Sequence, residues 1–131
     1  MTAKPTIGVN MDYRSAKKDS SPYSFLHAGY CSALQKAGAI PLLLPPLDDE
    51  DDIRQALNMF DGILLIGGAD LDCRHDGYML HPSMRVLDPR REEFDRTLMR
   101  LVADRRMPVM GVGCGMQLLN VSQGGNLFLH I

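Results

Sequence analysis

The sequence predicts an α/β domain with a mainly parallel sheet and helices on both faces. Short runs of branched aliphatic residues alternate with segments in which apolar residues recur every three or four positions. The 131 residues, 45% of them hydrophobic and 23% charged, are enough for one core. No internal repeat or low-complexity linker interrupts the alternation. Strands that alternate with helices imply right-handed crossovers between parallel strands.

The first half of the chain predicts three strands and two helices. Apolar residues between Pro22 and Ala37 recur at helical spacing, and Gly38 follows as a helix stop. The acidic run Asp48–Asp52 is interpreted as the first turn of the second helix, where carboxylates meet the helix dipole favourably. The predicted strands are Thr6–Asn10, Ala39–Leu44 and Asp61–Ile66, with a loop at 12–21. The run at 39–44 is typical of a strand covered on both faces, although Pro41 favours an edge or strand-start position.

The second half begins with an irregular stretch from Gly67 to Pro89, longer than most connections and therefore interpreted as functional or mobile. The elements predicted after it are a helix at Arg91–Arg105, a strand at Met107–Val112, a helix at Met116–Ser122 and the start of a strand at Asn126–Leu129. No closing helix follows that strand. We therefore expect the sheet to be truncated at the C-terminus.

Composition excludes several classes of function. Fourteen basic and sixteen acidic residues give a net charge of −2 without a basic face, so we expect no nucleic-acid or membrane partner. The absence of a long apolar run and of a signal peptide favours a cytoplasmic location. Three cysteines without C-x-x-C spacing predict neither disulfides nor a zinc site, and we expect no cofactor and no metal.

Other polar residues are predicted to have ordinary structural roles. Asp70 and Asp72 favour loop capping over metal binding because no further ligands lie near them in sequence. We predict Cys31 in the core and Cys73 at the surface. The four histidines are predicted to be exposed or hydrogen-bonded rather than catalytic: His27, His75, His81 and His130.

The segment Gly111–Gln117 carries the main chemical prediction. A strand enters a helix here through a glycine-rich bend. A nucleophile at such an elbow stands at a helix N-terminus, where the dipole lowers the pKa of a thiol and free N–H groups hold an oxyanion. Cys114 is therefore the candidate nucleophile.

Several segments resemble the class I glutamine amidotransferase superfamily, and most closely its gamma-glutamyl-gamma-aminobutyrate hydrolase-like branch. The resemblance covers nearly the whole chain, so residues 1–131 are expected to form the N-terminal portion of a single domain. The segments that carry it are Pro5–Val9, Ala37–Pro41, Gly62–Asp70, Asp88–Arg91, Pro108–Val112, Gly115–Val121 and Gly124–Gly125.

The resemblance implies a flavodoxin-like fold and hydrolysis of a small gamma-glutamyl amide through a cysteine thioester. It implies that Gly67 and Gly68 supply one oxyanion-hole N–H and that the residue after the nucleophile supplies another. Arg91 is a candidate contact for a substrate carboxylate. The remaining candidate oxyanion or substrate residues surround the elbow: Gly113, Gly115 and Met116.

The sequence departs from the family pattern in two ways. The family's nucleophile position falls on Gly113, with Cys114 one residue later, and the family's His-x-Glu segment is absent from this chain. Two hypotheses stay open: a hydrolase that uses Cys114, or an inactive remnant or fragment that acts as a binding or assembly module. The second hypothesis includes homo-oligomers or pairing through the uncovered C-terminal strand. A nucleotide-binding function is disfavoured because neither glycine pair fits a phosphate-loop pattern.

Overall fold

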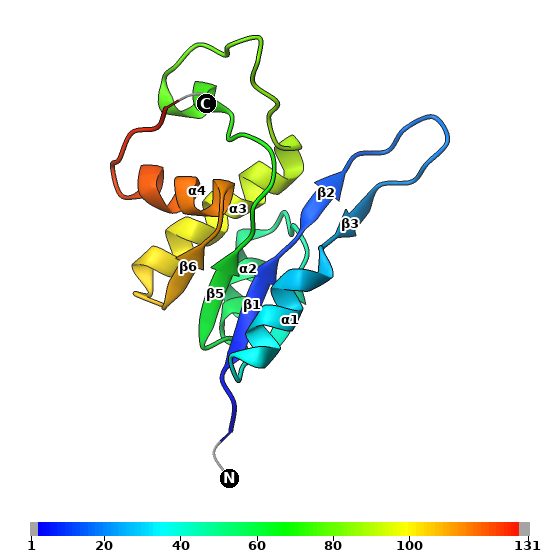
Figure 1. Cartoon of the computed structure of the whole chain (residues 1–131). Helices are drawn as coiled ribbons and strands as arrows, with labels where there is room; N and C mark the ends of the chain where they lie inside the picture. Colours follow the sequence, from blue (N-terminus) through cyan, green and yellow to red (C-terminus); the bar gives the residue numbers. More distant parts are fainter. Residues whose placement is uncertain (1–2, 129–131) are drawn as a thin grey trace.

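A computed structural model describes residues 3–128 and has a parallel four-stranded sheet at its centre (Figure 1). The strand order is β4-β1-β5-β6, and all three pairings are parallel. The strands are β1 (Thr6–Asn10), β4 (Ile40–Leu44), β5 (Gly62–Leu65) and β6 (Val109–Gly111). The predicted α/β, flavodoxin-like class is confirmed.

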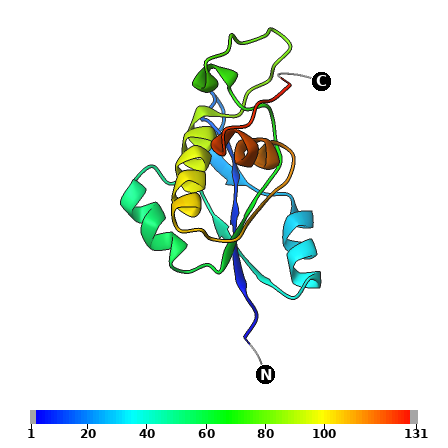
Figure 2. The same cartoon turned by 90° about the vertical axis from the view of Figure 1, so that its left-hand side faces the viewer.

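Within residues 3–128, four α-helices flank the sheet unequally. Figure 2 shows α1 (Ala28–Lys36) on one side of the sheet, with α2 (Glu50–Leu57) and α3 (Pro89–Asp104) on the opposite side. The fourth, α4 (Cys114–Ser122), shares the apolar cluster of α2 and α3. Phe94 and Leu98 of α3 lie in the larger apolar cluster with Ile53 of α2 and Leu118 of α4. The cluster on the α1 side is smaller, so most of the core lies on one face.

Local sequence explains where the helices begin and end. The carboxylate of Asp49 accepts hydrogen bonds from the backbone N–H groups of Asp51 and Asp52, which caps α2 as the acidic run predicts. Asp88 caps α3 in the same way, and Pro89 occupies its first position, where proline is favourable. Gly38 follows α1 with a φ of 92°, as a C-terminal glycine should.

The structure corrects the predicted loop at 12–21. A hairpin forms there from β2 (Asp12–Arg14) and β3 (Tyr23–Phe25), and it projects beyond the sheet (Figure 1). Because Tyr23–Phe25 is extended, α1 begins at Ala28 rather than near Pro22. Strands of three residues carry too little periodicity to be recognised from sequence alone.

Two further strand predictions are wrong in part. β4 is an edge strand as Pro41 indicated, but it is not covered on both faces, because Ile40, Leu42 and Leu43 are exposed. Residues 126–128 form no strand, and Leu129 lies outside the described residues, as does His130. Within residues 3–128, none of the helices is long and apolar enough to span a lipid bilayer.

Candidate functional site

The candidate site lies at the carboxyl ends of β5 and β6, where ligand crevices form in parallel sheets. The N–H of Val112 donates to the carbonyl oxygen of Leu65 at 2.9 Å, which extends the pairing of the two strands up to both glycine turns. A Cβ atom on Gly113 would lie 3.3 Å from the Cα of Gly67. The fold therefore brings the predicted elbow at Gly113 close to the turn at Gly67 and Gly68, which is called the oxyanion turn below.

Gly113 forms the bend itself. It has φ 56° and ψ −122° and immediately precedes α4. Residues with a side chain rarely adopt this backbone conformation, and a sharp, strained bend of this kind is expected where a nucleophile elbow joins a strand to a helix. Among the described residues, the atom that a Cβ at this position would meet within 4 Å is the Cα of Gly67, in a tight contact. Gly113 itself is exposed at the surface of the bend.

Gly115 allows α4 to lie directly on the sheet. A Cβ at Gly115 would stand 2.4 Å from the carbonyl oxygen of Leu65, and one at Gly111 would stand 2.5 Å from the backbone of Gly115. Both distances are shorter than any real contact. Gly115 therefore acts by close packing, while the adjacent Met116 is exposed.

Cys114, the candidate nucleophile, is the first residue of α4 and is buried. Its Sγ lies 3.6 Å from the carbonyl oxygen of Ile66 and 3.6 Å from Nη2 of Arg91. Burial raises the pKa of the Cys114 thiol to about 11, although the Arg91 guanidinium opposes the shift. The thiol is thus protonated at neutral pH and packed beneath the elbow.

Arg91, the candidate substrate contact, is fully buried. Its Nε pairs with Asp95 at 3.1 Å, and its Nη2 donates to the carbonyl oxygen of Ile66 at 3.0 Å. Its Nη1 lies 3.4 Å from a carboxylate oxygen of Asp12. The charge of Arg91 is therefore balanced inside the protein, and contact with a substrate stays a prediction.

Asn10 is a site residue that the sequence did not single out. Its Oδ1 accepts from the N–H of Ile66 at 2.7 Å, and its Nδ2 donates to Asp95 at 2.9 Å. Burial raises the pKa of Asp95 to about 6, against the opposing effects of Arg91 and Asn10. The sequence signal that could have identified Asn10 is its place as a polar residue at the carboxyl end of a buried strand. Asn10 and Arg91 together hold both backbone polar groups of Ile66, just before the oxyanion turn.

The oxyanion turn has its own contacts. The N–H of Gly67 donates to the hydroxyl of Tyr30 at 3.0 Å. A Cβ on Gly68 would stand 2.3 Å from Nη1 of Arg91, so the turn packs on the buried guanidinium. The oxyanion roles of Gly67 and Gly68 stay predictions.

Comparison with known proteins identifies the family. The family model described as Peptidase C26 matches residues 5–131. The chain belongs to the peptidase C26 family. Its relatives include a Mycobacterium tuberculosis protein provisionally named a glutamine amidotransferase, 34% identical over 132 residues. The gamma-glutamyl-gamma-aminobutyrate hydrolase of Escherichia coli O157:H7 is 30% identical over 124 residues. The predicted class I glutamine amidotransferase-like resemblance is confirmed.

This C26 chain spans about half the length of the curated relatives it matches. The first match covers 98% of this chain and 43% of the M. tuberculosis protein, and the second covers 94% of this chain and 48% of the E. coli enzyme.

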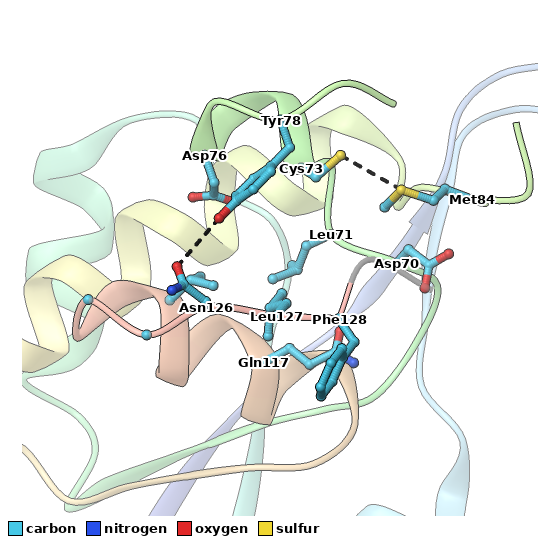
Figure 3. A pocket seen from close by; sticks show the side chains of 13 residues that line it. Asp70, Leu71, Cys73, Asp76, Tyr78, Met84, Gln117, Asn126, Leu127 and Phe128 are labelled. Atoms are coloured by element: carbon cyan, nitrogen blue, oxygen red, sulfur yellow. Dashed lines mark hydrogen bonds between the residues drawn. The ribbon is translucent and has the colours of Figure 1, made fainter. Parts of the chain in front are cut away.

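The long loop of the C26 chain frames a cavity of about 420 Å³, with residues 70–84 on one side and α4 and residues 124–128 on the other (Figure 3). As predicted, Asp70 and Asp72 act in loop capping: Asp70 accepts from the N–H of Arg85, and Asp72 caps the short helix Cys73–Asp76. The prediction for Cys73 is wrong, because Cys73 is buried and its Sγ lies 3.7 Å from Sδ of Met84.

The other minor predictions for the C26 chain have mixed outcomes. Cys31 is only half-buried, which corrects its assignment to the core. His27, His75 and His81 are exposed, as predicted. Among the described residues, no group of three or more His, Cys, Asp or Glu side chains gathers as metal ligands do.

Proposed function

We propose that this chain is a binding or assembly module of the gamma-glutamyl hydrolase fold and does not form a thioester on Cys114. It would present the elbow and the oxyanion turn toward a small gamma-glutamyl compound. The proposal follows the second of the two hypotheses that the sequence left open.

The observation that carries the proposal is the difference in exposure between Gly113 and Cys114. Gly113 occupies the exposed elbow without a side chain, whereas the only adjacent thiol, that of Cys114, is buried on Ile66 and Arg91. Nucleophilic attack requires a thiolate within reach of the substrate carbonyl. A protonated thiol beneath the bend satisfies neither condition.

The alternative is hydrolysis through Cys114. It draws support from the Arg91 guanidinium 3.6 Å from the sulfur and from the helix N-terminus, since both favour a thiolate. Burial outweighs these effects on the thiol pKa. The alternative would also need the sulfur to leave its packed position.

Incubation with gamma-glutamyl p-nitroanilide tests the proposal. We expect neither release of p-nitroaniline nor a gamma-glutamyl adduct on Cys114 by mass spectrometry. Colour release or an adduct that disappears in a Cys114→Ala variant would overturn the proposal.

A Gly113→Cys variant provides the matched control. Its introduced thiol should stand at the exposed bend and react with iodoacetamide at neutral pH, while Cys114 in the same variant stays unmodified. Strain at the positive φ should cost about 1–3 kcal/mol of stability. If the introduced thiol and the thiol of Cys114 react at equal rates, the assignment of exposed and buried positions is incorrect.

A further inference from the structure

A ring of hydrogen bonds joins the carboxylate of Asp95 to the residue that follows β5. Nδ2 of Asn10 donates to Oδ1 of Asp95 at 2.9 Å, and Oδ1 of Asn10 accepts from the N–H of Ile66 at 2.7 Å. Nε of Arg91 donates to Oδ2 of Asp95 at 3.1 Å, and its Nη2 donates to the carbonyl oxygen of Ile66 at 3.0 Å. All three polar side chains are buried, so a bond that breaks here has no ready replacement from solvent.

The donors in this ring match an ionised Asp95. Both carboxylate oxygens of Asp95 accept, one from the amide of Asn10 and the other from the guanidinium of Arg91. A protonated carboxyl group carries a hydrogen on one of its oxygens and must find an acceptor for it. In this ring each oxygen faces an N–H donor instead.

A proton on Asp95 therefore conflicts with the ring on either side. On Oδ1 it would draw the amide oxygen of Asn10 toward itself and turn Nδ2 toward Ile66, because only the oxygen of an amide accepts. The hydrogen bond from the N–H of Ile66 would then be lost. On Oδ2 the proton would oppose Nε of Arg91, whose guanidinium has no acceptor atom. In both cases a contact that holds Ile66 in place is weakened.

The groups packed around Asp95 set the pH at which this change occurs. Arg91 of α3 pairs with the carboxylate, and Asp12 of β2 and Cys114 of α4 lie 3.4 and 3.6 Å from the same guanidinium. Burial raises the pKa of Asp95 to about 6, and the opposing effects of Arg91 and Asn10 only partly offset it. The thiol of Cys114 has a pKa of about 11 and keeps its proton, whereas Asp95 changes charge as the pH crosses about 6.

Ile66 immediately precedes Gly67 and Gly68, so its position fixes where the oxyanion turn begins. We infer that Asn10 and Asp95 are positioning residues for this turn. Ionised Asp95 holds the amide of Asn10 in the orientation that fixes Ile66, and protonation of Asp95 releases the turn. The inference rests on the proposed function, in which the turn faces a gamma-glutamyl compound, so binding of that compound should weaken as the pH falls.

NMR spectroscopy of the free chain tests the coupling. The carboxyl carbon of Asp95, the side-chain amide of Asn10 and the backbone amides of Ile66 and Gly67 are followed from about pH 4.5 to about pH 7.5. We expect all of them to titrate with one midpoint near pH 6. Protection of the Ile66 N–H from hydrogen exchange should fall about tenfold toward the acidic end. Amides that do not respond while the carboxyl carbon titrates would overturn the inference.

Two variants separate this coupling from a general effect of acid. Asn10→Ala leaves Asp95 able to titrate but removes the link, so the amides of Ile66 and Gly67 should no longer follow the carboxyl group. Asp19→Asn, at an exposed position, should keep the wild-type response. A wild-type response in folded Asn10→Ala would also overturn the inference.

Isothermal titration calorimetry with gamma-glutamyl p-nitroanilide tests the consequence for the ligand. We expect the affinity at pH 5 to be about fivefold below that at pH 7.5, because only the fraction of the protein with an ordered turn binds. Asp95→Asn should remove this pH dependence, since its amide does not titrate. Equal affinity at both pH values in the wild type would overturn the inference. Absence of binding at either pH would contradict the proposed function, while the NMR titration would still decide the coupling.

Discussion

The guanidinium of Arg91 lies 3.6 Å from the sulfur of Cys114, and both groups donate to one carbonyl oxygen, that of Ile66. This arrangement joins α3, α4 and the end of β5 directly beneath the elbow. The Cys114 thiol therefore belongs to a packed polar cluster, and its chemistry should reflect burial more than its place at a helix N-terminus.

Cys114 should resist alkylation in the folded protein. With a thiol pKa of about 11, its thiolate fraction at pH 8 is roughly 200-fold below that of a free cysteine with a pKa of about 8.5. Peptide mass spectrometry after timed exposure to iodoacetamide measures this directly, with Cys31 as the half-buried comparison. Equal labelling of Cys31 and Cys114 would contradict the burial of the thiol.

Asp95 should make stability depend on pH in the direction opposite to that of a carboxylate whose pKa is lowered by folding. Burial raises the pKa of Asp95 from 3.8 to about 6. As pH rises, the unfolded state therefore loses this proton at a lower pH than the native state does. The stability that Asp95 contributes is present below about pH 4 and is lost as pH rises through about 6.

Urea unfolding between pH 4 and pH 7 measures this effect. The Asp95→Asn variant should lose stability less steeply than the wild type across this range, whatever its absolute stability. Asp19→Asn, at an exposed position, should retain the wild-type pH profile. An identical profile for Asp95→Asn would show that the carboxyl is not perturbed.

Gly115→Ala should destabilise the protein by about 1–3 kcal/mol or more, because its Cβ would overlap the backbone of Leu65. Gly29→Ala is the matched substitution in α1, where a Cβ meets nothing within 4 Å. It should be neutral or stabilise by up to about 1 kcal/mol. Thermal unfolding of both variants provides the comparison, and equal changes would argue against the close approach of α4 to the sheet.

Phe94→Ala should cost about 3–5 kcal/mol, because the ring is 2% exposed among the side chains of the larger cluster. Phe128→Ala removes the same side chain from a position that is 88% exposed and should change stability by less than about 0.5 kcal/mol. Chemical denaturation of the two variants tests whether Phe94 lies in the core and Phe128 outside it. Similar losses for both would mean that Phe128 is packed in solution.

The main elements could be predicted from sequence because their signals are local. Asp61–Ile66 and the glycines after it predict a buried strand and a turn, and the structure has β5 at Gly62–Leu65. The acidic run before α2 and the Asp-Pro pair before α3 also specify helix starts through hydrogen bonds to adjacent N–H groups. The hairpin of β2 and β3 was missed because its strands are only three residues long.

The sequence by itself determined the α/β class, the family and the position of the bend between β6 and α4. Only the tertiary structure decided which of the two residues at the bend faces outward. Gly113 is exposed at φ 56°, whereas Cys114 is buried. Likewise, only the tertiary structure brought together Asn10 and Asp95, 85 positions apart, and buried Arg91 beside Asp95. Periodicity reports interactions between near neighbours, whereas side-chain direction at a bend and the pairing of buried charges depend on how distant segments pack.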